Sequence, residues 1–355
     1  MSTTELHDDP VPAKVAKRAR VQAEWCARLG SPLYGELVER VAADVETGGA
    51  FHELMTDPAV EPLGDVPMLR LMGAAHRLAL AGQAPDLARF YPSCGGVADP
   101  DGAWAALLAL ARESPELLRE HIGRPVQTNE IGRSAPLSGG FASVARDTGL
   151  PLRLLEVGAS AGLNLRFDQY RYETGGRAFG PEDSPVVLRG HWDSGEPPYD
   201  VQVQVSERRG CDPRPVDATS EGGRLTLLSY LWPDQLERFE RLRGALEIAR
   251  RLPVTVEQAD GRAWVERELA QAAPGAATVV FHSVVMPYLS HEEREGFAAT
   301  VRAAGERAGD DAPLAWLRME YGGDECELRL TLWPGGSGRL LATCGFHGLH
   351  VVWLE

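Results

Sequence analysis

The sequence predicts an α/β protein in which a helical N-terminal domain or cap precedes a doubly wound, mostly parallel Rossmann-like sheet. Three observations lead to this prediction. The first 150 residues carry apolar side chains at helical spacing, the remaining residues alternate short apolar runs with helical patterns, and a glycine-rich turn follows the first of those runs. We expect the helical part to span residues 1–150 and the sheet domain to span residues 151–355.

Apolar residues three or four positions apart predict the helices of the N-terminal part. The expected helices are 11–29, 33–45, 66–80 and 101–122. Gly30 ends the first pattern, and a turn rich in Pro and Gly at 91–96 separates the last two. Because no stretch before residue 150 alternates like a strand, we expect helices throughout this part.

After residue 150, apolar runs bounded by turn residues predict strands, and longer periodic stretches predict helices between them. The expected strands are 152–157, 186–189, 201–205, 254–258, 278–285, 314–320, 327–333 and 347–354. The expected helices are 224–251, 263–271 and 292–308. The last two strands follow each other without a helix, so we expect an antiparallel pair at one edge of the sheet.

Charge and hydropathy exclude several classes of partner. The chain has 36 Lys and Arg against 51 Asp and Glu, a formal net charge of −15, and such a surface repels nucleic acid. No apolar run is long enough to span a bilayer and the first ten residues lack a signal region, so we expect a cytoplasmic protein with no membrane partner. We expect a small-molecule substrate, and the oligomeric state stays open.

Cysteine and histidine spacing argues against a metal site. The cysteines are odd in number and never spaced as Cys-x-x-Cys; they are Cys26, Cys94, Cys211, Cys326 and Cys344. The run Cys344-x-x-His347-x-x-His350 has no recognised metal spacing either. We therefore expect no metal and no disulfide framework.

The stretch 156–164, Glu-Val-Gly-Ala-Ser-Ala-Gly-Leu-Asn, carries the main chemical signal. Gly158 can adopt dihedrals that other residues avoid, and the small residues at 159–162 leave no bulk above the turn. We expect a helix to start after this turn, so that a ligand meets backbone N–H groups at its N-terminus. This pattern is typical of a nucleotide-type pocket at the carboxyl end of a parallel strand.

The same letters also spell Gly-x-Ser-x-Gly, the nucleophile elbow of α/β-hydrolases. In that interpretation Ser160, Asp260 and His347 form a triad in the expected chain order. A third interpretation is that the turn serves packing alone, since one short match is weak evidence. The acidic Glu156 before the turn favours the cofactor interpretation.

Glu-Val-Gly-Ala-Ser-Ala-Gly resembles the first motif of class I S-adenosylmethionine-dependent methyltransferases, acidic-x-Gly-x-Gly-x-Gly, with Ser160 at the middle glycine. The strand order over residues 150–355 is similar to that family's sheet, including its non-helical pair at the end. Nearly the whole chain also resembles an uncharacterised bacterial family known only as a domain of unknown function. That second resemblance lies in the turn and in blocks at 128–133, 209–217, 230–235 and 282–285.

The methyltransferase resemblance implies S-adenosylmethionine as the cofactor and assigns residues to it. Glu156 would orient the amino group, Asp212 would hold the ribose hydroxyls, and Asp260 would receive the adenine amino group. The cofactor-binding positions implied are Glu156, Gly158, Ala159, Ser160, Gly162, Asn164, Asp212 and Asp260. An alternative for Asp260 is the N-cap of the following helix, and both roles are compatible.

His282, at the end of a predicted strand, is the candidate catalytic base, and a buried core histidine is its alternative. The candidate substrate-binding residues are Asn129, Arg133, Trp232, Asp234 and Tyr288. Their alternatives are a solvated loop for the first two and a helix-to-helix corner at Trp232-Pro233.

Three functions follow from these observations. The first is methyl transfer from S-adenosylmethionine to a small molecule, with the helical part as a lid. The second is a regulatory or non-catalytic protein of the same fold that binds a nucleotide-like ligand. The third is a serine hydrolase that uses Ser160.

Overall fold

A computed structural model describes residues 10–61 and 66–355 of the chain. It divides the chain into two compact units, here called the N-terminal unit (Met1–Thr128 with Ser220–Phe239) and the sheet unit (Asn129–Thr219 with Glu240–Glu355). The division therefore falls before residue 129 rather than at the expected residue 150. A segment from the second half of the chain also joins the N-terminal unit.

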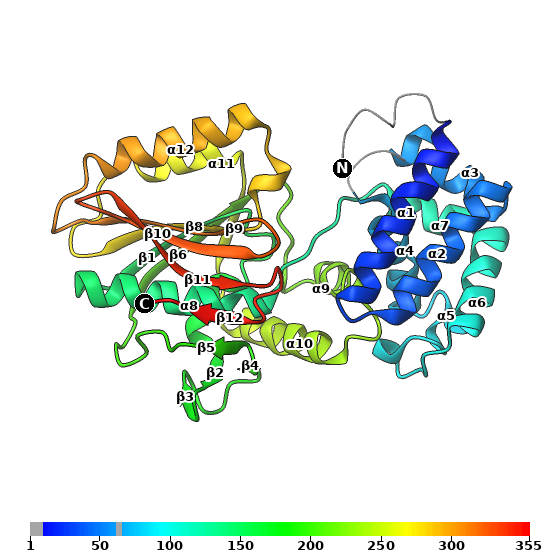
Figure 1. The fold of residues 1–355 in the computed structure, drawn as a ribbon, viewed down its shortest axis with the longest axis horizontal. Coiled ribbons are helices and arrows are strands. Elements are labelled where there is room, and N and C mark those ends of the chain that lie inside the picture. The colour runs from blue at the N-terminus through cyan, green and yellow to red at the C-terminus, as the bar shows by residue number, and fades with distance from the viewer. Residues whose placement is uncertain (1–9, 62–65) are drawn as a thin grey trace. The chain divides into compact units, whose positions relative to one another are not determined.

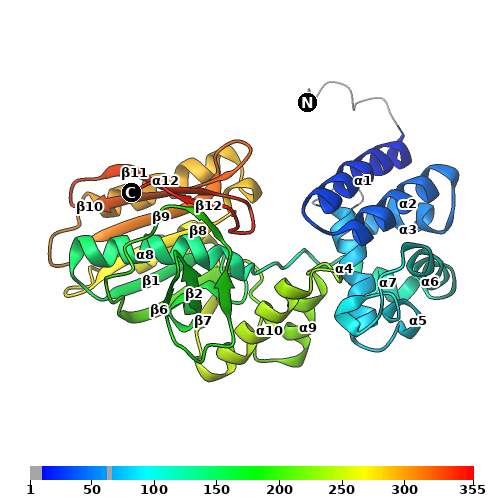
Figure 2. The ribbon, with the colours of Figure 1, turned by 60° about the horizontal axis from the view of Figure 1, so that its bottom comes forward.

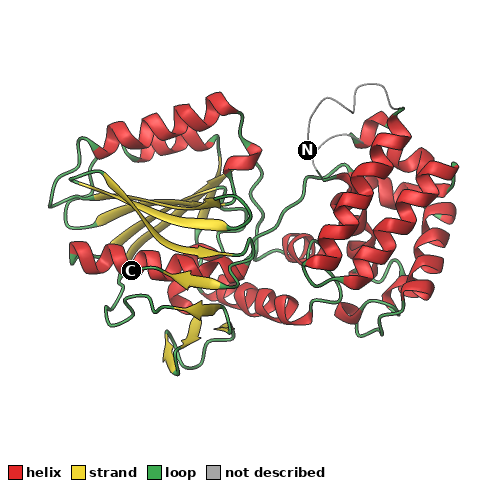
Figure 3. Cartoon of the chain, viewed as in Figure 1, coloured by secondary structure: helices red, strands yellow, loops and turns green. Residues whose placement is uncertain are grey.

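The N-terminal unit is built from helices, as the apolar spacing predicts (Figures 1 and 3). Its elements are α1 Val11–Arg28, α2 Pro32–Thr47, α3 Ala50–Thr56, η1 Pro58–Val60, α4 Pro67–Leu80, α5 Pro85–Ala88, η2 Pro92–Cys94, α6 Pro100–Glu113, α7 Pro115–Ile122 and α9 Glu221–Ser229. The single helix expected at 101–122 is wrong: Ser114 ends α6, and Pro115 begins α7 because proline lacks the N–H that a continuing helix needs.

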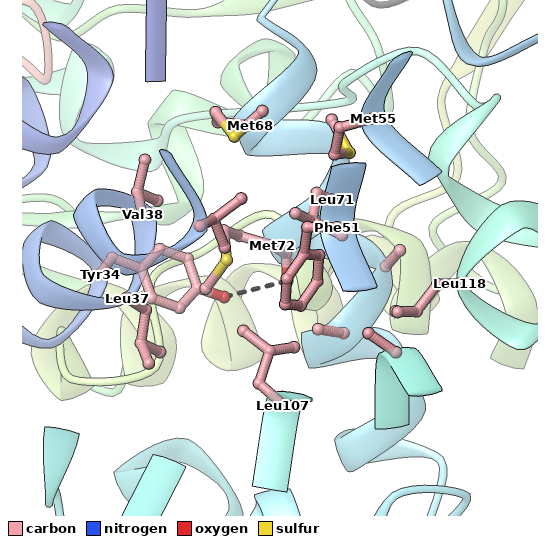
Figure 4. Packing of buried hydrophobic residues seen from close by; sticks show 14 of the residues in the cluster. Tyr34, Leu37, Val38, Phe51, Met55, Met68, Leu71, Met72, Leu107 and Leu118 are labelled. Carbon is pink, nitrogen blue, oxygen red and sulfur yellow. Dashed lines mark hydrogen bonds between the residues drawn. The ribbon is translucent and has the colours of Figure 1, made fainter. Parts of the chain in front are cut away.

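Buried apolar side chains of α2, α3, α4, α6 and α7 form one core in the N-terminal unit (Figure 4). Figure 4 shows Phe51, Leu71 and Leu107 meeting at its centre, while the Tyr34 hydroxyl donates to the Met72 carbonyl at 3.1 Å. The tyrosine contributes its ring to the core without leaving its hydroxyl unpaired.

Ser220–Phe239 joins this unit through specific polar contacts. Asp234 accepts from the Ser31 hydroxyl at 2.5 Å and from the Leu33 backbone N–H at 3.1 Å, so it holds the start of α2. The Tyr230 hydroxyl donates to the Pro125 carbonyl at 3.1 Å. The single helix expected at 224–251 is wrong, because the chain breaks between α9 and α10 (Leu236–Arg251) around Pro233.

The described part of the sheet unit contains a nine-stranded, mostly parallel sheet in the order β5-β12-β11-β10-β9-β8-β1-β6-β7 (Figures 1 and 2). Its strands are β1 Leu152–Val157, β5 Trp192–Ser194, β6 Val205–Asp212, β7 Thr255–Gln258, β8 Ala277–Ser283, β9 Leu314–Tyr321, β10 Cys326–Trp333, β11 Ser337–Cys344 and β12 Val351–Trp353. A smaller sheet contains β2 Arg171–Thr174, β3 Arg177–Phe179 and β4 Val187–Arg189.

Five neighbouring strands of the sheet are mutually parallel; they are β9, β8, β1, β6 and β7. This arrangement confirms an α/β fold with a large, mostly parallel sheet. The antiparallel part differs from the expected edge pair. β9, β10 and β11 form a meander inside the sheet, and the edge beyond them is made by β12 and β5. The strand expected at 201–205 lies later in the chain, because β6 begins only at Val205 and extends to Asp212.

Helices cover both faces of the large sheet, as a doubly wound fold requires (Figure 1). The helices are α8 Ser134–Thr148 on one face and α11 Gly261–Glu268 with α12 His291–Gly305 on the other; short 3₁₀ turns are η3 Ile131–Arg133, η4 Asn164–Gln169 and η5 Met286–Tyr288. In β1, Leu152 and Leu154 pack with α8, while Leu155 and Val157 pack with α11 and α12. This period of two fixes the face on which each site residue lies.

Candidate functional site

Glu156 is a buried acidic residue of the sheet unit. It follows Leu154 by two positions in β1 and therefore points to the α8 face, at the carboxyl end of the strand. Its side chain is 2% exposed, and its Oε2 accepts no hydrogen bond from any described residue. Burial raises its pKa well above the ordinary value, the charges of Arg166 and Arg133 oppose this, and Asp212 adds to it. This carboxyl therefore favours its neutral form.

The turn after β1 is held by side chains from three directions. The Ser160 N–H donates to Asp212 at 2.9 Å, and the Leu163 N–H donates to Asn129 at 2.9 Å. The Arg166 guanidinium donates to the Gly162 carbonyl at 2.7 Å. With these contacts the backbone keeps left-handed dihedrals at Gly158 (φ 69°), Ser160 (φ 52°) and Gly162 (φ 65°).

The protein itself fills the space beside the two glycines. A Cβ on Gly158 would lie 2.5 Å from Val285 Cγ2, and one on Gly162 would lie 2.9 Å from Val256 Cγ2. Ala159 packs against Gly210 in the same way. The small residues of the turn therefore serve packing, as one interpretation of the sequence held, and ligand approach depends on other surfaces of the turn.

The helix expected after the turn is wrong. The structure has η4, a six-residue 3₁₀ segment with a kink at Arg166, and then the strand β2. Arg166 bends back to the Gly162 carbonyl and also donates to the Leu252 carbonyl at 2.8 Å, so the segment cannot extend as a regular helix. The expected helix N-terminus is consequently not a feature of this site.

Asp212 lies where the resemblance expects an acidic residue, at the carboxyl end of β6 beside β1. Residues between η4 and β6 form the small sheet, which accounts for the long spacing from Gly162. Its two carboxylate oxygens accept from the Ser160 and Arg214 backbone N–H groups at 2.9 and 2.8 Å. Asp212 therefore already supports the turn.

Asn164 and Asp260 take structural roles. Asn164 is buried and accepts from the Ser134 hydroxyl at 2.7 Å, which ties the turn to the first residue of α8. Asp260 accepts from the Ala263 N–H at 2.9 Å and caps α11, the alternative that the sequence offered. It follows β7, the edge strand next to β6.

His282 lies on the opposite face of the sheet from Glu156. Phe281, the residue before it in β8, packs in the cluster on the α8 face, so His282 points to the other face. There its ring contacts Phe297 of α12, with ring centroids 5.7 Å apart. Its Nε2 accepts from the Trp316 indole N–H at 3.1 Å, so its Nδ1 carries the proton and donates to Glu320 at 2.6 Å. With both ring nitrogens engaged, His282 is a buried core histidine and has no lone pair available for a general base.

Glu320 is a residue that the sequence reasoning missed. Its carboxylate also accepts from the Val285 and Met286 backbone N–H groups at 2.9 and 3.2 Å, and so fixes the segment after β8. That segment contains Val284 with φ 56°, an uncommon value for a β-branched residue. The sequence signal was only a glutamate at the end of an expected strand, and its partners lie far away along the chain.

The residues that were expected to bind the substrate belong to two different units. Trp232 is buried in the N-terminal core and Asp234 holds α2, so these two belong to the packing of the N-terminal unit. Arg133 and Asn129 lie in the sheet unit, and the structure brings both to the turn and the strand ends around Glu156. Tyr288 is 69% exposed and follows β8 in η5.

The hydrolase triad is not assembled as expected. Ser160 has the left-handed φ of 52° that an elbow would use, but its N–H binds Asp212. Asp260 is engaged as the cap of α11 rather than with His347. Among the described residues, no group of three or more His, Cys, Asp or Glu side chains is arranged to hold a metal ion.

The helices within residues 10–61 and 66–355 do not combine the length and apolar character that crossing a bilayer requires. The family described as "Uncharacterized protein conserved in bacteria (DUF2332)" matches residues 16–353. No curated protein and no solved structure matches the chain.

Proposed function

The chain belongs to this bacterial family, and from that premise we propose that it transfers a methyl group from S-adenosylmethionine to a small-molecule acceptor. The observation that carries the proposal is the buried Glu156 carboxyl with an unpaired oxygen at the carboxyl end of β1. An unsatisfied buried polar group is unfavourable unless a ligand pairs with it. The resemblance of the turn assigns the amino group of the cofactor to this position.

The residues around Glu156 fit the amino-acid end of such a cofactor. Glu156 would hold the ammonium group, and the backbone braced by Asp212 and Asn129 would orient the rest of the ligand. When bound, S-adenosylmethionine supplies an activated methyl group, so the protein's task is mainly to align it with the acceptor.

Glu156 also predicts a proton linkage. Burial favours its neutral form, whereas an ammonium group beside it favours the ionised form. Cofactor binding therefore shifts Glu156 toward its ionised form and releases protons.

Calorimetric titration tests this proposal. S-adenosylmethionine and S-adenosylhomocysteine should bind in the micromolar range, about −8 kcal/mol, with a net release of protons when buffers of different ionisation enthalpy are compared. Glu156→Gln should abolish the proton release and weaken binding about tenfold or more, as expected for loss of a charge-assisted hydrogen bond. Absence of binding by both ligands would contradict the proposal.

Glu268→Gln is the matched control, because Glu268 is a buried carboxylate of the same unit that is already paired. It accepts from Arg153 at 2.9 Å and from Arg209 at 2.7 Å. We expect this variant to lose stability and to keep the ligand affinity and the proton release of the wild type.

A second candidate is a non-catalytic protein that binds the same ligand. The observation that favours it is the engagement of both nitrogens of His282, which leaves the expected base occupied. Ligand binding without methyl transfer to any acceptor in a panel of small acids, phenols and amines would favour this candidate. Labelling by a fluorophosphonate that disappears in Ser160→Ala would favour the hydrolase instead.

We also propose the cytoplasm as the compartment. Four of the cysteines are buried thiols; they are Cys26, Cys211, Cys326 and Cys344. Thiols of this kind are typical of a reducing compartment.

A further inference from the structure

A second set of residues lies on the same face and edge of the sheet as Glu156. Tyr321 is the last residue of β9 and follows Met319 by two positions, so both lie on the same face of the sheet. Met319 packs in the same cluster as Leu154 and the α8 side chains. β8 separates β9 from β1, and Glu156 is level with Leu317, four residues before Tyr321, so the two positions are about 10 Å apart across the strands and about 13 Å apart along them. A molecule beside Tyr321 would therefore lie beyond the same edge and on the same face of the sheet as the site assigned to the cofactor.

Arg133 is fixed at this edge with unused hydrogen-bonding capacity. Its Nε donates to the Phe346 carbonyl at 3.1 Å and its Nη1 donates to the Ser283 carbonyl, at the end of β8, at 2.9 Å. Within residues 10–61 and 66–355 its Nη2 has no hydrogen-bond partner, and the guanidinium forms no ion pair. An arginine held in place without a carboxylate, in a chain with a net charge of −15, is suited to an anionic ligand.

Aromatic residues lie at the same edge as this guanidinium, which binds the Phe346 carbonyl. Phe346 packs on Tyr321 with ring centroids 4.7 Å apart, and Tyr321 is nevertheless 52% exposed. Tyr288 follows the segment after β8 that Glu320, the neighbour of Tyr321, binds through the Val285 and Met286 N–H groups. Exposed aromatic residues gathered at the end of parallel strands are typical of a binding surface.

Glu320 holds part of this surface in place. By binding His282 and the backbone N–H groups of Val285 and Met286, it fixes the segment that leads to Tyr288. Arg133 is fixed in turn by two backbone carbonyls. The surface is therefore organised before a ligand arrives, which reduces the entropy that binding must overcome.

We propose that Arg133, Tyr288, Tyr321 and Phe346 form the acceptor subsite and that it takes a small planar aromatic carboxylate. The carboxylate pairs with the free edge of the Arg133 guanidinium, and the ring lies against the tyrosines. Glu320 is a positioning residue of this subsite. The role as acceptor subsite rests on the proposed methyl transfer, whereas the binding itself does not.

Saturation-transfer NMR on the full-length wild-type protein tests the subsite with benzoate, benzamide and cyclohexanecarboxylate as probes. We expect benzoate to bind about tenfold more tightly than either of the others, because benzamide lacks the charge and cyclohexanecarboxylate lacks the aromatic ring. Equal binding of benzoate and benzamide would overturn the proposal. This comparison of ligands needs no variant and is therefore independent of folding defects.

Variants locate the binding site. Arg133→Gln should remove the preference for benzoate over benzamide, and Tyr321→Leu should remove the preference over cyclohexanecarboxylate. Matched controls come from β3, where the Arg177 guanidinium lies 4.9 Å from the Phe179 ring centroid. Arg177→Gln and Phe179→Leu should leave both preferences unchanged; an equal loss in these controls would place the binding elsewhere.

The same experiment separates this inference from the proposed function. Selective benzoate binding without S-adenosylhomocysteine binding would keep the anion site and remove its role as an acceptor subsite. S-adenosylhomocysteine binding without a benzoate preference would keep methyl transfer and overturn the subsite.

Discussion

His76 of the N-terminal unit and Glu156 of the sheet unit are both buried polar residues, but they differ in how their polar atoms are paired. His76 of the N-terminal unit is fully buried, and its Nδ1 donates to the Leu231 carbonyl at 2.9 Å while its Nε2 accepts from the Ser93 hydroxyl at 2.7 Å. Glu156 of the sheet unit is equally buried but leaves Oε2 unpaired. The first group connects helices, and the second has capacity for a partner that the chain does not supply.

This difference distinguishes a polar pair that the protein satisfies from a candidate for ligand binding. His76 and Ser93 look like a catalytic pair, but the backbone N–H groups after Ser93 are used within their own turn, at Cys94, Gly95 and Gly96. No donor of that turn is left to stabilise an oxyanion. Because the chain satisfies the His76–Ser93 pair, we assign this pair to packing, whereas the unpaired oxygen of Glu156 supports the proposed ligand site.

The largest expected effect is on stability, from removal of His76. His76→Ala should lower the free energy of unfolding by about 3–4 kcal/mol, because it leaves a cavity and unpaired carbonyl and hydroxyl groups. Urea denaturation measures this change. Ser93→Ala should lower it by about 1–2 kcal/mol. A loss below about 1 kcal/mol for His76→Ala would contradict a structural role.

Acidification should sharpen the comparison, because the two groups respond to pH in opposite directions. Burial lowers the pKa of His76 to about 4, so the unfolded chain takes up the proton first. The contribution of His76 to the free energy of unfolding is fully present above about pH 6.5. As the pH falls toward 4, up to about 3 kcal/mol of that contribution is lost. Glu156, whose pKa is raised by burial, instead favours the folded state at low pH and destabilises it as the pH rises above 4.5.

Denaturation curves between pH 4 and pH 8 for the wild type and His76→Gln measure the histidine contribution. His191, whose pKa burial also lowers to about 4, is unchanged in both proteins and cancels in their difference. An identical pH dependence of the two proteins would refute the assignment to His76.

Gly158→Ala should be the next largest effect. We expect a loss of about 2–3 kcal/mol, because the new Cβ combines left-handed strain with a clash against Val285. Gly149→Ala is the matched control, since Gly149 has φ 67° and open space around its Cβ position. The control should lose about 1 kcal/mol, and Val285→Ala should partly rescue Gly158→Ala. Equal losses at both glycines would show that Val285 does not fill the turn.

Asp234→Ala should have the smallest effect. It removes the support of the α2 start and should lower stability by about 1 kcal/mol. Titration with S-adenosylhomocysteine should give the wild-type affinity, because the structure assigns Asp234 to packing. A tenfold weaker affinity would restore the substrate role that the sequence suggested for it.

The sequence predicted the apolar elements well. β1 matches the expected residues 152–157. The helices α2 and α4 match the helical spacing expected at 33–45 and 66–80, and both begin at a proline. The helix α8 was not expected from the sequence. β6 was displaced because Glu207, Arg208 and Arg209 look like a loop. In the sheet they are paired, with Arg153 bonding Glu207 at 2.7 Å and Arg208 bonding Asp168. Long-range ion pairs of this kind leave no local pattern in the sequence.

The sequence predicted some residues of the candidate site, mainly those at the ends of strands. Glu156, Asp212 and Arg133 were identified and lie together around the turn. His282 was assigned as a base because the sequence does not reveal that Trp316 and Glu320 occupy its nitrogens. Which residue satisfies a buried polar atom depends on tertiary contacts, and these decide between structure and function here.

The most direct test of the central claim is the free energy of unfolding of Glu156→Met with and without S-adenosylhomocysteine. Without ligand, we expect the variant to be more stable than the wild type by about 1–2 kcal/mol, since it removes an unpaired buried carboxyl. Ligand at 100 times its Kd should stabilise the wild type by about 2.7 kcal/mol and leave the variant unchanged. A variant that is less stable than the wild type and gains the same stabilisation from the ligand would show that Glu156 is a structural residue.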